Sequence, residues 1–108
     1  MMEGSIILAA LPQSDGQTKR RPALALRRMP GFGDYLVCGI STQLHQEIKG
    51  FDEVLTPDDN NRLKLPSVIR LGFLSVVPAS QIVGAIGRIP ASLQAALLQR
   101  LADYLVAP

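Results

Sequence analysis

The last part of the chain carries four leucines at a spacing of four residues, within the segment from Ser92 to Val106. They are Leu93, Leu97, Leu101 and Leu105. Residues four apart share one face of an α-helix, so this repeat predicts an amphipathic helix with one buried stripe. The same face would hold Ala96 and Tyr104, and the other faces Gln94, Gln99, Arg100 and Asp103. The rest of the chain must therefore supply an apolar surface for this helix to cover.

Short apolar runs, separated by proline and glycine, fill most of the chain before that helix. Their length and their content of Val, Ile and Leu predict β-strands. The predicted strands are Ser5–Leu11, Ala23–Arg27, Tyr35–Ser41, Glu53–Thr56, Ser67–Leu71 and Gln81–Gly87. A polar loop, Gln13–Thr18, would join the first two. We expect a mainly β (α+β) fold, a small curled β-barrel with a C-terminal amphipathic helix, as a single domain over residues 1–108.

The second predicted strand is apolar on both of its faces. Side chains alternate across a strand, so Ala23 and Ala25 face one way and Leu24 and Leu26 the other.

The composition suffices for a small folded domain without cross-links. The chain has 108 residues, 47% of them hydrophobic, and a single cysteine, Cys38, which excludes an intramolecular disulfide. A buried thiol is typical of the reducing cytoplasm, and no apolar stretch approaches the length of a membrane span. One histidine and one cysteine cannot form a zinc site by themselves. We expect a soluble, cytoplasmic protein without a metal or an organic cofactor.

The positive charges gather in one short region. The net charge is +2, yet five of the eleven Lys and Arg residues fall within ten positions. They are Lys19, Arg20, Arg21, Arg27 and Arg28. A local basic patch on a nearly neutral chain suits a short anionic ligand better than long duplex DNA, which recruits many phosphate contacts. A solvated charged turn is the alternative interpretation.

Two short segments combine charge with hydroxyl groups. Lys19–Leu26 is a basic turn that leads into an apolar strand, and Pro22 stiffens the backbone after Arg21. Ile40–Gln43 ends the next apolar run with hydroxyls and an amide. Neighbouring antiparallel strands bring the start of one run close to the end of the next, so the Arg21 guanidinium and the Ser41 hydroxyl should meet at one rim of the sheet. A guanidinium held there is a donor fork for phosphate oxygens.

These segments resemble the MazF/PemK family of bacterial toxin-antitoxin ribonucleases. Members carry a basic residue plus Arg-Pro-Ala/Val before one strand, as in Lys19–Leu26, and a Thr/Ser-x-Gln type of ending on the next, as in Ser41–Gln43. Pro66–Leu71 matches a later family strand that carries an active-site Arg. The resemblance implies an SH3-like barrel with a C-terminal helix.

The resemblance also implies an activity and partners. The activity is metal-independent cleavage of single-stranded RNA by attack of the neighbouring 2′-hydroxyl on phosphorus, which leaves a 2′,3′-cyclic phosphate and a 5′-hydroxyl. The family is usually homodimeric and is inhibited by a small acidic antitoxin, whose partly disordered tail lies over the active groove.

Individual residues take roles from the resemblance. Arg21 matches the catalytic Arg of the Arg-Pro pair, Ser41 stands where the family usually has a catalytic Thr, and Arg70 matches the Arg of the later strand. The candidates for substrate binding are Lys19, Arg20, Thr42, Gln43 and His45.

One position departs from the family pattern. Many relatives have an Asp two residues after the Arg that Arg70 matches, and this chain has Gly72. Imidazole groups titrate near neutral pH, so we hypothesise that His45, the only histidine, reaches the site and compensates for Gly72. Two alternatives stay open, a catalytically impaired homologue that binds RNA or antitoxin and a plain SH3-like protein-interaction module.

Overall fold

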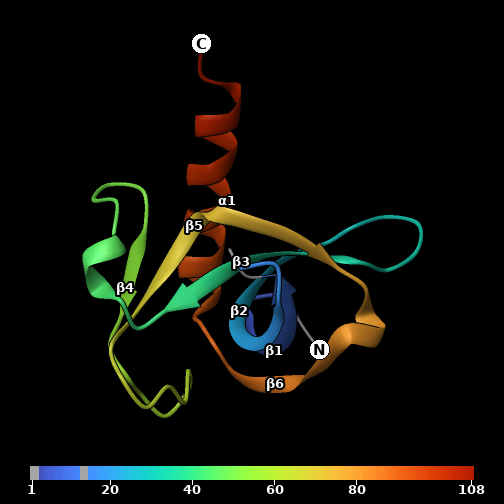
Figure 1. Cartoon of the computed structure of the whole chain (residues 1–108). Coiled ribbons are helices and arrows are strands. Elements are labelled where there is room, and N and C mark those ends of the chain that lie inside the picture. Colours follow the sequence, from blue (N-terminus) through green and yellow to red (C-terminus); the bar gives the residue numbers. More distant parts are fainter. Residues whose placement is uncertain (1–2, 13–14) are drawn as a thin grey trace.

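The computed structural model describes residues 3–12 and 15–108, which form one curled antiparallel sheet of six strands and one α-helix (Figure 1). The strands are β1 (Ser5–Pro12), β2 (Thr18–Arg28), β3 (Tyr35–Ser41), β4 (Glu53–Leu55), β5 (Ser67–Val77) and β6 (Ile82–Arg88). The helical segments are η1 (Leu44–Gln46), η2 (Ala79–Gln81) and α1 (Ala91–Val106). The strand order is β4-β5-β3-β2-β1-β6, which makes a curled half-barrel. The predicted mainly β fold with a C-terminal helix is confirmed.

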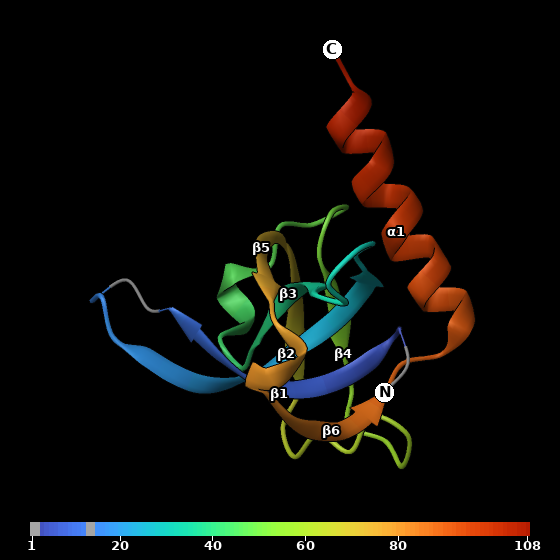
Figure 2. The same cartoon turned by 90° about the vertical axis from the view of Figure 1, so that its right-hand side faces the viewer.

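The β1–β2 hairpin is longer than the apolar run of its second strand predicts. β2 begins at Thr18, so the predicted basic turn at Lys19–Arg21 is wrong, and these residues continue the strand. Pairing with β1 extends to Pro12 opposite Thr18, and this backbone ladder keeps the charged residues extended. Figure 2 shows the hairpin reaching out from the body of the molecule. Of the predicted loop, Gln13 and Ser14 lie outside the described residues.

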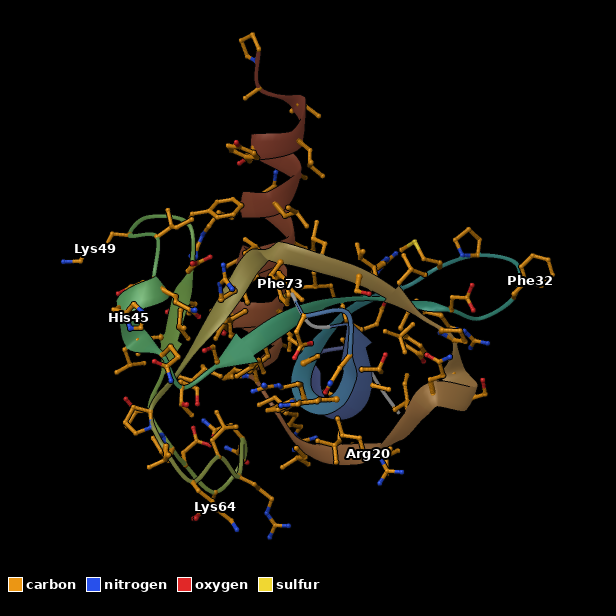
Figure 3. All side chains as sticks on the ribbon, viewed as in Figure 1. Arg20, Phe32, His45, Lys49, Lys64 and Phe73 are labelled. Carbon is orange, nitrogen blue, oxygen red and sulfur yellow. The ribbon has the colours of Figure 1, made fainter. Side chains whose placement is uncertain are left out.

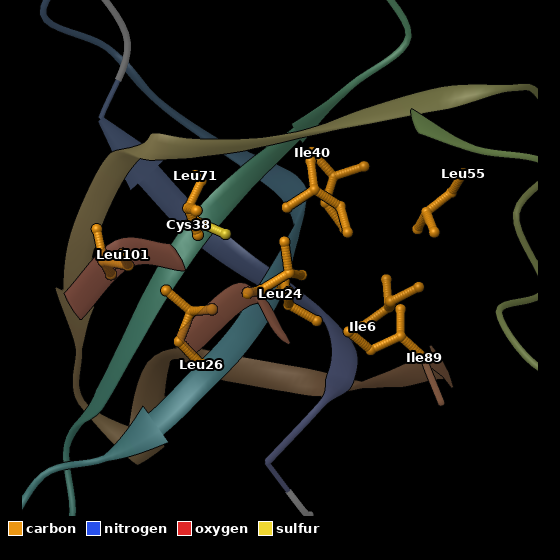
Figure 4. Close-up of a cluster of buried hydrophobic side chains, with 11 residues drawn as sticks. Ile6, Leu24, Leu26, Cys38, Ile40, Leu55, Leu71, Ile89 and Leu101 are labelled. Carbon is orange, nitrogen blue, oxygen red and sulfur yellow. The ribbon is translucent and has the colours of Figure 1, made fainter. Parts of the chain in front are cut away.

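Both faces of β2 are buried, each in its own cluster. Leu24 and Leu26 lie in the cluster that the helix covers, and Ala23 and Ala25 lie in the other, which confirms the predicted alternation. The buried residues of the first cluster are Ile6, Leu24, Leu26, Cys38, Ile40, Leu55, Ile69, Leu71, Ile89, Leu97 and Leu101 (Figure 4). The second contains Ile7, Ala9, Ala23, Ala25, Tyr35, Val37 and Val77. β2 is therefore held in place by a hydrophobic cluster on each of its faces.

The helix buries only its N-terminal part. Leu97 is 0% exposed and Leu101 5%, but Leu105 is 67% exposed, so the predicted stripe is wrong at its end. Figures 1 and 2 show the cause, since α1 runs on past the body of the sheet. Gln94, predicted on a polar face, is buried, and its Nε2 donates to the carbonyl of Leu26. Leu26 lies at a bulge in the β2–β3 pairing, which leaves its carbonyl to a side-chain donor.

Gly87 sets how closely β6 approaches the loop before β5. A Cβ at Gly87 would lie 2.5 Å from the carbonyl oxygen of Asn60, and the N–H of Arg88 donates to that same oxygen at 2.9 Å. We expect Gly87→Ala to lower the free energy of unfolding by about 1–3 kcal/mol, because the backbone must shift. Gly84→Ala, on the same strand, is the matched control, since a Cβ there meets nothing within 4 Å. Urea denaturation compares the two variants, and equal stability would contradict the expectation.

Candidate active site

The sheet register brings the two sequence motifs together. Ala23 on β2 pairs with Gly39 on β3 at the end of this ladder, with Arg21 two residues before Ala23 and Ser41 two residues after Gly39. On the other side of β3, β5 pairs its Arg70 with Gly39. The three residues predicted as catalytic, Arg21, Ser41 and Arg70, thus line one hollow between these strands, which we call the β2–β3–β5 groove.

The β2–β3–β5 groove has a volume of about 780 Å³ and a mixed lining. Its polar lining residues are Arg21, Ser41, Thr42, Gln43, Gln46, Arg70 and Ser75. Its other lining residues are Pro22, Val37, Gly39, Ile40, Phe73 and Leu74. The structure therefore brings Thr42 and Gln43, two of the predicted substrate-binding residues, to the same hollow as the three predicted catalytic ones.

The groove is built to attract anions. Among the described residues that line it there are two guanidinium groups and no carboxylate. The Oγ of Ser41 accepts the N–H of Gln43 at 3.0 Å, which fixes the oxygen at the strand end and leaves the hydroxyl able to donate. Two guanidinium groups and a hydroxyl around one hollow suit the oxygens of a phosphodiester.

A bulge in β5 shapes one wall of the groove. The consecutive β3 residues 38–39 pair with Leu74 and Arg70, so residues 71–73 leave the regular ladder. Pairing resumes after them, and β5 ends at Val77. The predicted end of this strand at residue 71 is therefore wrong, because the strand continues through the bulge.

A buried carboxylate anchors the bulge. Oδ1 of Asp52 accepts the N–H of Leu71 at 3.0 Å, and Oδ2 accepts the N–H of Ile48 at 2.9 Å. Both oxygens of one side chain thus tie the loop before β4 to the residue that follows Arg70. This holds the backbone under Arg70 in place.

The bulge also brings an aromatic ring over β3. The ring of Phe73 lies so close to Gly39 that a Cβ at Gly39 would be 2.6 Å from its Cδ1. The guanidinium carbon of Arg70 is 5.1 Å from the ring centroid, a cation–π contact. Figure 3 labels Phe73 beside β5, on the side of β3.

Position 72 does not belong to the groove lining. A Cβ at Gly72 would meet Cε2 of Phe51 at 3.5 Å, an ordinary contact. Phe51 in turn packs on Tyr104 of α1, with ring centroids 5.2 Å apart. An acid at this position would leave the backbone toward these aromatic rings.

Three of the predicted substrate-binding residues lie outside the groove lining. Lys19 and Arg20 are exposed on the outer part of β2, and His45 is exposed on η1. Figure 3 labels Arg20 and His45 at separate places on the molecule. The neighbouring Gln46 lines the groove instead of His45, because successive side chains of a tight helical turn point in different directions.

Cys38 is unsuited to act as a nucleophile. Burial, with a smaller contribution from the Asp52 carboxylate, raises the pKa of its thiol from 9.0 to about 12. The thiol therefore stays protonated in the folded protein at pH values at which it ionises in the unfolded chain. The contribution of the protonated Cys38 thiol to the free energy of unfolding is complete below pH 9.0. It falls as the pH rises from there toward about 12.

We expect native Cys38 to resist thiol reagents. At about pH 8, labelling by Ellman's reagent should be more than about tenfold slower in the folded protein than in guanidinium chloride, because only the unfolded chain exposes the thiol. Equal rates in the two conditions would contradict the buried position of Cys38.

A second hollow, of about 490 Å³, lies at the β2–β3 turn. It is lined by Arg27, Arg28, Met29, Pro30, Gly31 and Gly33. Glu3 binds at this place, with its Oε1 3.4 Å from Nη1 of Arg27 and its Oε2 accepting the N–H of Arg28 at 2.9 Å. A carboxylate thus already compensates part of the positive charge here.

Within residues 3–12 and 15–108, no three His, Cys, Asp or Glu side chains are grouped so that they could hold a metal ion. In the same part of the chain, no helix has the length and apolar character needed to cross a membrane.

Two comparisons with known proteins point to the same family. The family model of the PemK-like, MazF-like toxin of type II toxin-antitoxin systems matches residues 2–105. Among solved structures, the chain is similar to the Mycobacterium tuberculosis toxin MazF-mt6, with 26% sequence identity and a TM-score of 0.69. That match covers 96% of this chain and 98% of the other. A comparison with curated proteins gives no match.

Proposed function

This chain belongs to the PemK-like, MazF-like toxins of type II toxin-antitoxin systems, and we propose that it is a metal-independent endoribonuclease that cleaves single-stranded RNA in the β2–β3–β5 groove. One observation carries the proposal. Arg21, Ser41 and Arg70, from three different strands, line one groove whose described lining residues include no carboxylate. A polyanion whose scissile group becomes more negative during the reaction suits such a groove.

The proposed reaction needs only groups of the substrate and the protein. The 2′-hydroxyl oxygen attacks the adjacent phosphorus, the bond from phosphorus to the 5′-oxygen breaks, and a 2′,3′-cyclic phosphate and a 5′-hydroxyl result. The proton of the 2′-hydroxyl leaves to solvent, and the 5′-oxygen takes one up.

Arg21 and Arg70 act in this scheme as electrostatic stabilisers of the phosphorane. A guanidinium has a pKa above about 12 and is a poor base near neutral pH, whereas its donors match phosphate oxygens well. Ser41 donates its hydroxyl to a phosphoryl oxygen or holds the 2′-hydroxyl in line. Thr42 and Gln43 contact the nucleotides on either side.

The groups outside the groove lining have a supporting role. Lys19, Arg20 and His45 are exposed. We assign Lys19 and Arg20 to attracting the RNA and His45 to contacting it, rather than to bond breaking. Gly72 is not part of the groove lining, and the scheme assigns no step to an acid at that position.

Type II toxins work together with an antitoxin, and a dimer is typical of the family. We propose that this chain forms a homodimer and that the acidic tail of its antitoxin competes with RNA for the β2–β3–β5 groove. The two guanidinium groups of that groove support this competition, because an acidic peptide and RNA offer them the same kind of oxygens.

Gly72 favours a second candidate, a homologue that binds RNA or antitoxin without cleaving. The two candidates differ in one measurement. A long single-stranded RNA is incubated with the protein in EDTA, and the product ends are mapped. The ribonuclease proposal expects discrete cuts with 5′-hydroxyl ends that neither Arg21→Ala nor Ser41→Ala produces at the wild-type rate. Binding without cuts, from folded protein at high concentration, would select the non-catalytic candidate.

A further inference from the structure

We propose that Phe73 is a stacking residue that holds one nucleobase of the RNA next to the phosphate bound by Arg21 and Arg70. This inference takes its substrate class, single-stranded RNA, from the proposed function. It adds a substrate-positioning contact in the β2–β3–β5 groove.

The position of the ring supports the inference. Of the described residues that line the groove, Phe73 is the only aromatic one, and this residue is 49% exposed. An exposed aromatic ring inside a charged groove has no role in the core. Bases of single-stranded RNA stack on such rings, whatever their sequence, because every base has a π-face.

The backbone around the ring is adapted to hold it. The bulge at residues 71–73 carries the ring across β3, and Gly39 lacks the Cβ that would come within 2.6 Å of the ring. Asp52 fixes the bulge through the N–H of Leu71. A ring placed by a glycine on one strand and by an anchored bulge on the next is pre-organised, so little freedom is lost when a base stacks on it.

The positive charge of Arg70 next to the Phe73 ring indicates that the ligand is a nucleotide. Arg70 lies 5.1 Å from the ring centroid and lines the same groove as Arg21. A nucleotide combines a phosphate for the guanidinium groups with a flat base for the ring. An acidic peptide offers the charge without the base, and a second protein chain offers an apolar surface without the charge.

The test measures binding to RNA that cannot be cleaved, so that it does not depend on catalysis. The probe is a fluorescently labelled, fully 2′-O-methylated oligonucleotide. Its sequence spans a cleavage site mapped with wild-type protein. If wild-type protein makes no cut, the probe is the oligonucleotide that binds most tightly in a defined pool. Phe73→Leu keeps an apolar side chain of similar size, and Phe73→Tyr keeps the ring. Phe32→Leu is the matched control, because Phe32 is 97% exposed and does not line the groove.

Phe73→Leu is expected to weaken binding by about 5- to 150-fold, the range measured for loss of one base–aromatic stack. Phe73→Tyr and Phe32→Leu should bind as wild type does. Single nucleotides of the probe are then replaced by abasic ones. At one position, loss of the base should weaken binding to the wild-type protein but should not weaken binding to Phe73→Leu any further. That non-additivity identifies the stacked base.

Two results would overturn the inference. The first is that Phe73→Leu binds the RNA probe with wild-type affinity. If the same variant also loses its dimer in sedimentation equilibrium, the ring is assigned to protein contact instead. The other is additivity between Phe73→Leu and the abasic change at every position. Both are distinct from failure of the proposed function, which is absence of cleavage of unmodified RNA by wild type.

Discussion

Replacing Arg21 by alanine should lower kcat/KM for RNA cleavage by about 10²- to 10³-fold, as loss of one preorganised donor to a developing oxyanion does in other enzymes. The fold should persist, because Arg21 is exposed on β2 and belongs to neither buried cluster. Initial rates on a short RNA with one mapped cut measure the effect, and thermal unfolding measures stability. Most of the loss should appear in kcat, since the guanidinium contributes most when charge builds up on the phosphorane.

Arg20→Ala is the matched control for this prediction. Arg20 is the preceding residue of the same strand, carries the same charge, and does not line the β2–β3–β5 groove. Its loss should change only the salt-dependent part of binding, by at most about tenfold. Equal losses in the two variants would mean that the strand supplies general positive charge and that Arg21 has no special position.

Replacing Leu97 by alanine should lower the free energy of unfolding by about 2–5 kcal/mol, the usual cost of a large cavity in a core. Leu97 is 0% exposed and joins α1 to the cluster that contains Leu24 and Leu71. Leu105→Ala, two repeats further along the helix, should cost less than about 0.5 kcal/mol in the monomer, because Leu105 is 67% exposed.

Urea denaturation at several protein concentrations separates these two leucines. A shift of the midpoint without a change of slope is expected for Leu97→Ala. A comparable loss for Leu105→Ala at low protein concentration would contradict the exposed position of the helix end. A loss that appears only at high protein concentration would locate Leu105 in the interface of the proposed homodimer.

Local pattern was sufficient for most of the strands. The alternation of Ala23 to Leu26 predicted which of these side chains share a face, and both clusters confirm it. The end of the helix was not predictable in this way. A repeat of leucines gives the helix its apolar face, but whether Leu105 meets a partner depends on where the sheet ends. Gln94 is buried for a similarly non-local reason, a bulge in β2 that leaves the carbonyl of Leu26 to a side chain.

The residues of the candidate site likewise divide into those that local sequence pattern predicted and those that depend on non-local structure. Arg21 and Ser41 were predicted to meet because antiparallel neighbours bring a strand start and a strand end together, and they line one groove. Phe73 and Gln46 were missed. Phe73 reaches the groove only through the bulge of β5, which no side-chain pattern signals. Gln46 reaches it through the direction of the η1 turn, while the chemically more suggestive His45 does not line the groove.

The central claim is that RNA bound in the β2–β3–β5 groove is cleaved by attack of the RNA's own 2′-hydroxyl. The most direct test of this claim uses one pair of oligonucleotides. The first is a short all-ribose RNA with one mapped cut, and the second carries a single 2′-deoxynucleotide on the 5′ side of that cut. Both are incubated with wild-type protein in EDTA. We predict that the first is cut to a 2′,3′-cyclic phosphate and a 5′-hydroxyl, while the second binds and stays whole. Cleavage of the deoxy-substituted strand, or no cleavage of either, would contradict the proposed chemistry.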